Sequence, residues 1–377
     1  MRLEPARSGA RQERRTAENQ LLGRECVETI PMSAARQSSF PALAPFRVEP
    51  RYVARVWGYR DLRPWFDRTA EDEPIGEVWL TGDECLIATG PHASKTLGAL
   101  FAEAAGSLLG SLPGMGAAPT ASPMPVNSPL LVKVLFAKEK LSVQVHPDDA
   151  MARKYGLPNG KTECWYALAA EPGAKVAVGV KPGTTLVQIE EKIHAGTLED
   201  CLNMLPVKAG ETILVDAGAV HAVWPGSILL ETQQNADVTY RMYDYGRPRE
   251  LHIERALEAV RLATGSGKVA PLALADRTVL IDVGYFRMER IPVEGSRTSA
   301  SLRGAGPAGL AYLFAAAGTG RISGVGFEPV DLPARGMVAV PAAAPEFAVE
   351  NGGGLDLIRI TPNWPHSTEV GPGATRW

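Results

Sequence analysis

The sequence contains little cysteine, little histidine and little net charge, and each shortage excludes a kind of protein. Its four cysteines, Cys26, Cys85, Cys164 and Cys201, form no Cys-x-x-Cys pair. They therefore predict neither a disulfide framework nor a thiolate zinc site, and they suit a reducing cytoplasm. The net charge of −3 over 377 residues, with charges of both signs mixed, gives no electrostatic argument for binding nucleic acid.

Long apolar runs are also absent. None approaches the roughly 18 residues that a membrane-spanning helix requires, and the N-terminus lacks the apolar stretch of a secretory signal. We therefore expect a cytoplasmic protein without a membrane partner. Residues 1–44 are rich in Arg, Glu, Ser and Ala and show no sustained periodicity, so they are predicted to form a disordered tail.

The rest of the chain consists mainly of short strand-like segments separated by Gly and Pro. This pattern predicts a mainly β fold of the jelly-roll or sandwich type. We expect two β domains, residues 45–270 and 271–377. The first is predicted to contain a small helical insert at about residues 184–205, where Thr185 and Gln188 can form a capping box.

Four polar residues of the first domain suggest a metal site. Gln144 and His146 alternate along a predicted strand, so their side chains leave the same face. With Glu163 and His221 they offer an amide oxygen, two imidazoles and one carboxylate, a suitable ligand set for zinc. Two of only six histidines fall in these positions, which favours a site over chance. Residues 253–365 contain no histidine, so the second domain is predicted to lack an equivalent site.

These segments resemble the cupin superfamily, in which a metal sits inside a small β-barrel. Residues 210–221 are similar to its second motif, and Ser142-Val-Gln-Val-His-Pro-Asp-Asp149 is similar to type I mannose-6-phosphate isomerases of the short bacterial form. Similar stretches extend over roughly residues 46–262. The resemblance implies a catalytic cupin-type jelly-roll barrel for residues 45–270 and a degenerate cupin-like β domain for residues 271–377.

The resemblance also implies roles for individual residues. It implies one Zn²⁺ held by Gln144, His146, Glu163 and His221, with Lys161 and Arg241 as active-site cations for substrate binding and catalysis, Ser142 near the substrate phosphate, and Glu231 as an acidic residue of the pocket wall. Longer relatives have a histidine before the lysine, where this chain has Gly160. The catalytic base is therefore open, and our hypothesis is Glu231, with a water on the metal as the alternative.

The implied reaction is the interconversion of mannose 6-phosphate and fructose 6-phosphate through an enediol. Two alternatives remain: a sugar-phosphate-binding cupin without turnover, and an isomerase for another phosphosugar. The expected partner is a small hexose phosphate, and the expected state is a monomer or weak homodimer. Outside the site we expect Lys133 to be a strand-edge charge, His92 a surface residue, and His252 structural.

Overall fold

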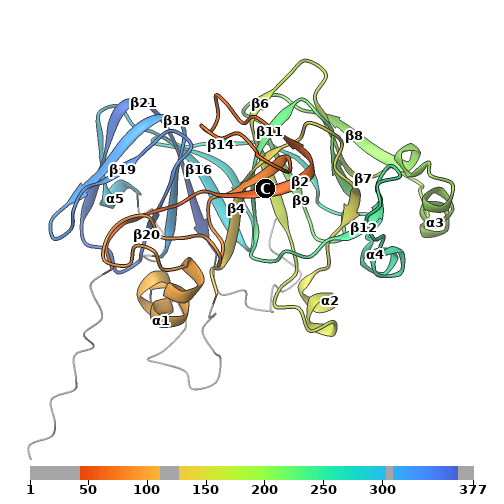
Figure 1. The fold of residues 1–377 in the computed structure, drawn as a ribbon, viewed down its shortest axis with the longest axis horizontal. Coiled ribbons are helices and arrows are strands. Elements are labelled where there is room, and N and C mark those ends of the chain that lie inside the picture. The colour runs from red at the N-terminus through yellow and green to blue at the C-terminus, as the bar shows by residue number, and fades with distance from the viewer. Residues whose placement is uncertain (1–42, 111–126, 303–308, 364–377) are drawn as a thin grey trace, which may run out of the picture. The chain divides into compact units, whose positions relative to one another are not determined.

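The computed structural model describes residues 43–110, 127–302 and 309–363 (Figure 1). Strands dominate these ranges, so the predicted mainly β fold class is confirmed. The predicted tail, residues 1–44, lies outside the described residues except for Leu43 and Ala44. Within the described ranges, no helix combines the length and apolar character that crossing a membrane requires.

A seven-stranded antiparallel sheet forms one wall of the first half of the molecule. Its order is β13-β9-β6-β11-β4-β3-β2. The strands are β2 (Arg51–Tyr59), β3 (Ile75–Trp79), β4 (Leu130–Phe136), β6 (Glu163–Ala170), β9 (Thr212–Val215), β11 (Ser227–Gln234) and β13 (Gly267–Val269).

A five-stranded sheet in the order β12-β5-β10-β7-β8 forms the facing wall. It consists of β5 (Val143–Val145), β7 (Lys175–Val180), β8 (Leu202–Pro206), β10 (His221–Val223) and β12 (Tyr240–Tyr243). Leu135 and Trp165 from the first wall and Val178 and Val223 from the second belong to one buried cluster. The two sheets therefore enclose a common core, as two inward-facing antiparallel sheets do in a jelly roll.

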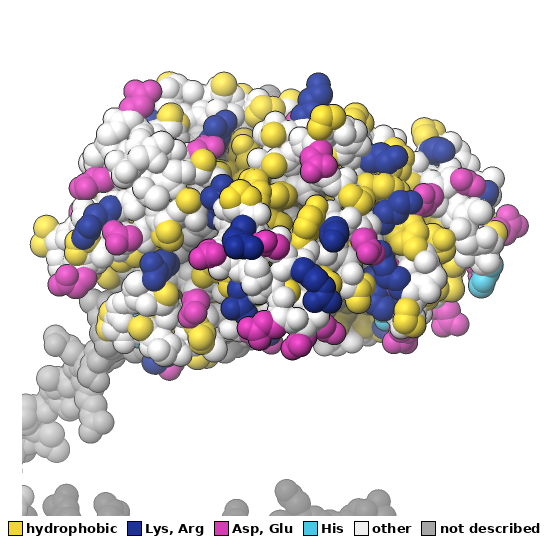
Figure 2. Space-filling view, turned by 45° about the horizontal axis from the view of Figure 1, so that its top comes forward, with side chains coloured by type: hydrophobic (Ala, Val, Ile, Leu, Met, Phe, Trp, Pro, Cys, Tyr) yellow, Lys and Arg dark blue, Asp and Glu magenta, His cyan; other side chains and the backbone are white. Residues whose placement is uncertain are grey.

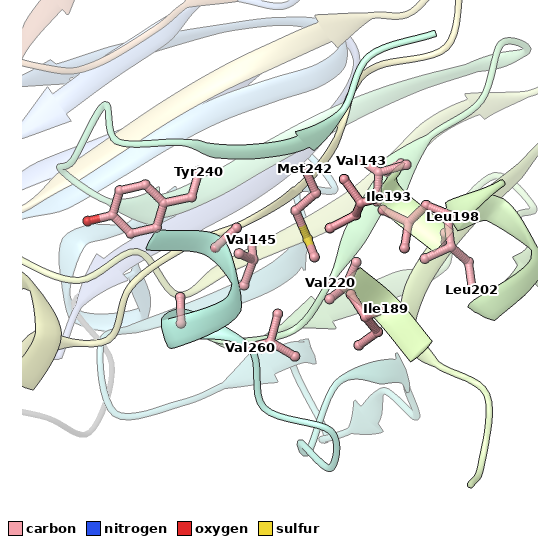
Figure 3. Close-up of a cluster of buried hydrophobic side chains, with 14 of the residues drawn as sticks. Val143, Val145, Ile189, Ile193, Leu198, Leu202, Val220, Tyr240, Met242 and Val260 are labelled. Atoms are coloured by element: carbon pink, nitrogen blue, oxygen red, sulfur yellow. The ribbon is translucent and has the colours of Figure 1, made fainter. Parts of the chain in front are cut away.

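Two helices cover the outer face of the five-stranded sheet. These are α3 (Leu186–His194) and α4 (Ile253–Ala259), and Figure 3 shows their apolar side chains packed against Val143, Val145 and Val220. Burial of this apolar face is the main force that holds short helices in place.

The region of the predicted helical insert, about residues 184–205, contains a helix and a 3₁₀ turn, but its last residues form a strand. The capping box of α3 is confirmed, because Thr185 Oγ1 accepts from Gln188 N and Gln188 Oε1 accepts from Thr185 N. A 3₁₀ turn, η1 (Leu198–Cys201), follows. Residues 202–206 then pair with β7 as the strand β8, so sheet pairing rather than helix formation ends the insert.

The remaining strands form a nine-stranded sheet, which we call the C-terminal sheet. Its strands are β1 (Phe46–Val48), β14 (Leu272–Ala273), β15 (Thr278–Asp282), β16 (Phe286–Pro292), β17 (Ser296–Thr298), β18 (Ala311–Gly324), β19 (Val330–Leu332), β20 (Met337–Val340) and β21 (Phe347–Pro362). Its helix is α5 (Ser299–Leu302), whereas α1 (Leu97–Leu109) and α2 (Asp149–Lys154) lie between strands of the first half. Because β1 pairs with β20, the N-terminal strand joins this sheet, and the domain division at residue 270 stays a prediction.

Candidate active site

Four side chains predicted as metal ligands meet between the two facing sheets. The ligand atoms of His146, Glu163 and His221 all lie within 4.8 Å of one another, and all three residues are buried. Gln144 joins them, because its Nε2 lies 3.2 Å from His221 Nε2. The structure therefore brings together residues that are up to 77 positions apart in the sequence.

Strand alternation explains why these side chains face inward. Val143 and Val145 of β5 pack under the helices, so Gln144 between them points to the other face of the sheet. In β10, His221 is directly opposite Gln144 in the antiparallel register. The turn before β10 requires Gly218, whose φ is +89° and whose Cβ, if present, would lie 2.7 Å from Arg261 Cγ.

The imidazole of His221 is oriented by the backbone. Its Nδ1 donates to Ala219 O at 2.9 Å, which leaves the lone pair of Nε2 directed towards the cluster. Burial lowers the pKa of His221, and burial together with the Lys161 ammonium lowers the pKa of His146 to about 3. Both imidazoles are therefore neutral at physiological pH, as metal binding requires.

Unsatisfied atoms test whether the cluster suits a metal. Glu163 Oε2 and His146 Nδ1 are buried and take part in no hydrogen bond with the described residues. Lys161 holds the pKa of Glu163 well below its ordinary value, against the effect of burial, so its carboxylate stays charged. Two neutral nitrogens, a carboxylate and a nearby amide match the donors that zinc prefers, so the residues fit the ion.

Lys161 lies at the centre of the charged groups. Its Nζ is 3.0 Å from His146 Nε2 and 3.1 Å from Glu163 Oε2, and it is 3.9 Å from Glu231 Oε1. Glu231 comes from β11, and Trp165 Nε1 donates to its Oε2 at 3.1 Å. Its Oε1 forms ion pairs with the ammonium groups of Lys133 and Lys161. Burial and the charge of Glu163 raise the pKa of Glu231 to about 7, which suits a group that exchanges protons.

The prediction for Lys133 is wrong. Lys133 is buried on β4, directly opposite Glu231, with its Nζ 3.2 Å from Glu231 Oε1 and 3.6 Å from Glu77 Oε1. The sequence around Lys133 could have indicated its burial, because every other residue of β4 is apolar. Side chains two positions apart on a strand share a face, so Lys133 faces the interior together with Leu135. The pKa of Lys133 is raised by these two carboxylates, although burial acts in the opposite direction.

Glu77 is a second residue that the sequence did not single out. Arg55 Nη2 pairs with its Oε2 at 3.0 Å, and Trp79 Nε1 donates to the same oxygen at 2.7 Å. Burial raises the pKa of Glu77, but Lys133 and Arg55 outweigh it and bring the pKa to about 2. Glu77 is therefore charged, and its carboxylate helps to hold the Lys133 ammonium next to Glu231.

A pocket with charged groups of both signs adjoins the cluster. It has a volume of about 370 Å³, and its lining includes Ser142, Lys161, Arg241 and Arg249 together with the carboxylates of Glu77, Glu231 and Asp237. Arg241 is opposite Gln144 in the register of β12 and β5, its Nη1 donates to Glu250 O at 2.7 Å, and its buried Nε has no hydrogen-bond partner among the described residues. Ser142 Oγ donates to Gln144 Oε1 at 3.1 Å. All eight candidate residues therefore lie in or next to one pocket.

Two histidines outside the site differ in outcome. His92 is only 4% exposed, so the prediction of a surface residue is wrong. His252 stands at the start of α4, and its Nδ1 accepts from Arg241 N at 3.2 Å. It thus supports the strand that carries Arg241, in line with the structural role expected for it.

The two facing sheets and the buried metal-type cluster define the class of this protein, a cupin-type β protein with an interior metal site. Comparisons with known proteins identify a family within this class. The family described as phosphomannose isomerase type I, catalytic domain, matches residues 46–178. A Bacillus subtilis (strain 168) protein named Probable mannose-6-phosphate isomerase GmuF is 31% identical over 323 residues, which cover 81% of this chain and 96% of that protein. The chain belongs to the type I phosphomannose isomerase family.

Solved structures share the fold. The mannose 6-phosphate isomerase from Bacillus subtilis aligns with a TM-score of 0.71 at 26% identity, over 84% of this chain and 99% of that chain. A mannose 6-phosphate isomerase solved with zinc bound aligns with a TM-score of 0.67 over 85% of this chain and 100% of that chain. At 15% identity, this second similarity shows the fold alone.

Proposed function

We propose that this protein is a zinc-dependent aldose–ketose isomerase that interconverts mannose 6-phosphate and fructose 6-phosphate through an enediol. The observation that carries the proposal is the cluster of His146, Glu163 and His221 next to a pocket that Lys161 and Arg241 line. Membership in the phosphomannose isomerase family supports the substrate.

Gln144, His146, Glu163 and His221 would hold one Zn²⁺. When bound, the ion supplies a Lewis acid that polarises a sugar carbonyl and stabilises negative charge on oxygen. Gln144 adds no charge, so Glu163 is the only anionic ligand and the site keeps a net charge of +1. In the structure Ser142 Oγ donates to Gln144 Oε1 and the amide Nε2 lies beside His221, so the amide would turn its oxygen towards the cluster to hold the ion.

The remaining residues bind and orient the substrate. Arg241 has a buried Nε with no hydrogen-bond partner among the described residues, and the pocket contains further cations, which suits a phosphate or an enediolate. Lys161, next to Glu163 and Glu231, can donate a hydrogen bond to a sugar oxygen that becomes negative. Ser142 can also donate to the phosphate.

Glu231 is our proposed base, which moves the proton between C1 and C2. A base must be deprotonated at the working pH and still bind a proton, and a pKa of about 7 meets both conditions. Lys133 pairs with the Oε1 atom of Glu231 and so keeps the carboxylate in place.

Turnover with and without metal tests the proposal. Fructose 6-phosphate formed from mannose 6-phosphate would be measured on purified protein, after metal removal, and after zinc is added back. We expect activity that is lost and then restored. A folded, zinc-loaded protein without turnover would point to another phosphosugar, or to a cupin that binds sugar phosphate without converting it.

The variant Glu231→Gln tests the base. Loss of a general base lowers kcat by about 10²–10⁴-fold, while zinc content and substrate affinity should persist. If Glu231→Gln kept near-normal turnover, the assignment of the base to Glu231 would be withdrawn.

The binding partner and the cellular setting are part of the same proposal. Lys and Arg side chains are intermixed with Asp and Glu on the face shown in Figure 2, which gives that face no extended basic surface for nucleic acid. We also propose a cytoplasmic location, a monomer or weak homodimer, and a catalytic domain ending near residue 270, followed by a degenerate cupin-like domain.

A further inference from the structure

Lys161 depends on a short segment that is fixed at three successive residues. Gly160 N donates to Asp149 Oδ1 at 2.8 Å, Lys161 N donates to Pro147 O at 3.0 Å, and Thr162 N donates to Gln234 Oε1 at 2.9 Å. The segment runs directly into β6 and Glu163. Its position therefore determines where the Lys161 ammonium and the Glu163 carboxylate lie.

The Asp149 carboxylate is the centre of this arrangement. Besides Gly160 N, its Oδ1 accepts from Gln234 Nε2 at 3.0 Å. Gln234 in turn binds both backbone groups of Thr162, because its backbone N donates to Thr162 O at 3.2 Å. One carboxylate thus holds Gly160 directly and Thr162 through a single amide.

The contact between the segment and α2 leaves no space for adjustment. A Cβ added to Gly160 would lie 2.6 Å from Asp148 C and from Asp149 N. Backbone is thus packed directly on backbone, and a displacement of Asp149 would move the segment as well.

The other oxygen of Asp149 is held by the C-terminal sheet. Tyr285 lies in the turn between β15 and β16, and its hydroxyl donates to Asp149 Oδ2 at 2.8 Å. Tyr285 is itself anchored, because its carbonyl accepts from Asn363 N at 3.0 Å. A residue 136 positions away therefore completes the hydrogen bonds of the carboxylate that fixes Gly160.

We propose that Tyr285 is a positioning residue, through which the C-terminal sheet fixes Asp149 and thereby Lys161 beside the candidate metal ligands. The expected loss of kcat rests on the proposed isomerase function. The expected loosening of the segment around Lys161 does not. It gives the C-terminal sheet a part in the site that goes beyond covering the first half of the molecule.

The test compares two hydroxyl deletions, Tyr285→Phe and Tyr312→Phe. Tyr312 is the matched control, because its hydroxyl also joins the C-terminal sheet to the first half, at 3.1 Å from Ser128 Oγ, but away from the pocket. Both variants should lower the melting temperature by about 2–4 °C. Only Tyr285→Phe should lower kcat, by about ten-fold with KM within about two-fold, since a small misplacement of a catalytic group is costly.

A second measurement is independent of turnover. Amide hydrogen exchange should become faster in residues 155–163 of Tyr285→Phe, and it should stay unchanged there in Tyr312→Phe. Equal kcat losses in both variants, or unchanged exchange in Tyr285→Phe, would overturn the proposal. If the unaltered protein failed to convert mannose 6-phosphate, the proposed function would fall, and the exchange measurement alone would decide the role of Tyr285.

Discussion

Two buried carboxylates, Glu163 in the candidate metal cluster and Glu289 in the C-terminal sheet, are both 1% exposed yet have different surroundings. Glu163 Oε2 accepts no hydrogen bond from the described residues, and its charged neighbour is the Lys161 ammonium, with two neutral imidazoles beside the carboxylate. Glu289 accepts from Arg287 Nε at 3.0 Å on one oxygen and from Arg359 Nε at 2.9 Å on the other.

This difference shows how a site can be told from a structural ion network. A buried charge is tolerated when its hydrogen bonds are satisfied, and Glu289 meets this condition with guanidinium groups on both oxygens. A buried carboxylate and imidazole with open positions are instead arranged for something that binds there. Burial and charge alone would have placed both carboxylates in one group, whereas the hydrogen bonds that their own oxygens accept from the described residues separate them.

Glu163→Gln should give the largest effect on function. The substitution removes the only carboxylate among the proposed ligands, so zinc content should fall and turnover should drop by about 10³-fold or more. Metal analysis and turnover of mannose 6-phosphate measure this. The loss of unfolding free energy in the metal-free protein should be smaller than in Glu289→Gln. If the Glu163→Gln variant still bound zinc and kept its activity, Glu163 would not be a metal ligand.

Glu289→Gln should show the reverse pattern. It leaves buried guanidinium groups without their counter-charge, which costs about 3–5 kcal/mol of unfolding free energy. The kcat of the folded fraction should stay within about two-fold, because Glu289 belongs to the C-terminal sheet rather than to the pocket. Urea unfolding and turnover on the same samples check both halves. A large kcat loss without a stability change would contradict the comparison.

The contribution of Glu289 should also depend on pH. Burial raises its pKa, but Arg359 and Arg287 outweigh it, so the folded pKa lies below the ordinary value of about 4.3. The stabilisation is complete above that ordinary value and is lost as pH falls through the folded pKa. The difference in unfolding free energy between the unaltered protein and Glu289→Gln should therefore shrink from about pH 6 to pH 3. A constant difference would mean that the carboxylate charge is not involved.

Arg241→Ala should mainly weaken substrate binding. Losing one charge-assisted hydrogen bond of about 1.5–3 kcal/mol predicts a rise in KM of about 10–100-fold. Arg247→Ala is the control, because Arg247 lies six residues after Arg241, pairs with Asp244 and Glu139, and is not among the residues that line the pocket. Equal KM values in the two variants would show that Arg241 does not contribute to substrate binding.

The sequence predicted the fold class and the convergence of the candidate ligands, because alternation along β5 and the motif spacing are local properties. The apolar strand around Lys133 could have indicated its burial, but not its partner, which depends on the register that places it opposite Glu231. Tyr285 could not be predicted, since its contact with Asp149 joins a turn of the C-terminal sheet to helix α2, 136 positions away. The prediction that the helical insert extends to residue 205 was wrong for the same reason. Residues 202–206 form a strand because they pair with the edge of β7.

Arg290→Ala should give the smallest effect and sharpen the comparison within the C-terminal sheet. Arg290 follows Glu289 on β16, but it points to the other face, where its side chain is 52% exposed and pairs with Asp356 at 2.6 Å. An exposed pair of this kind contributes about 0.2–1 kcal/mol and weakens with salt. Urea unfolding at low and high salt should show a small, salt-sensitive loss in Arg290→Ala and a large, salt-insensitive loss in Glu289→Gln. Similar losses in the two variants would mean that burial does not set the strength of these ion pairs, and the contrast drawn from Glu289 would fail with it.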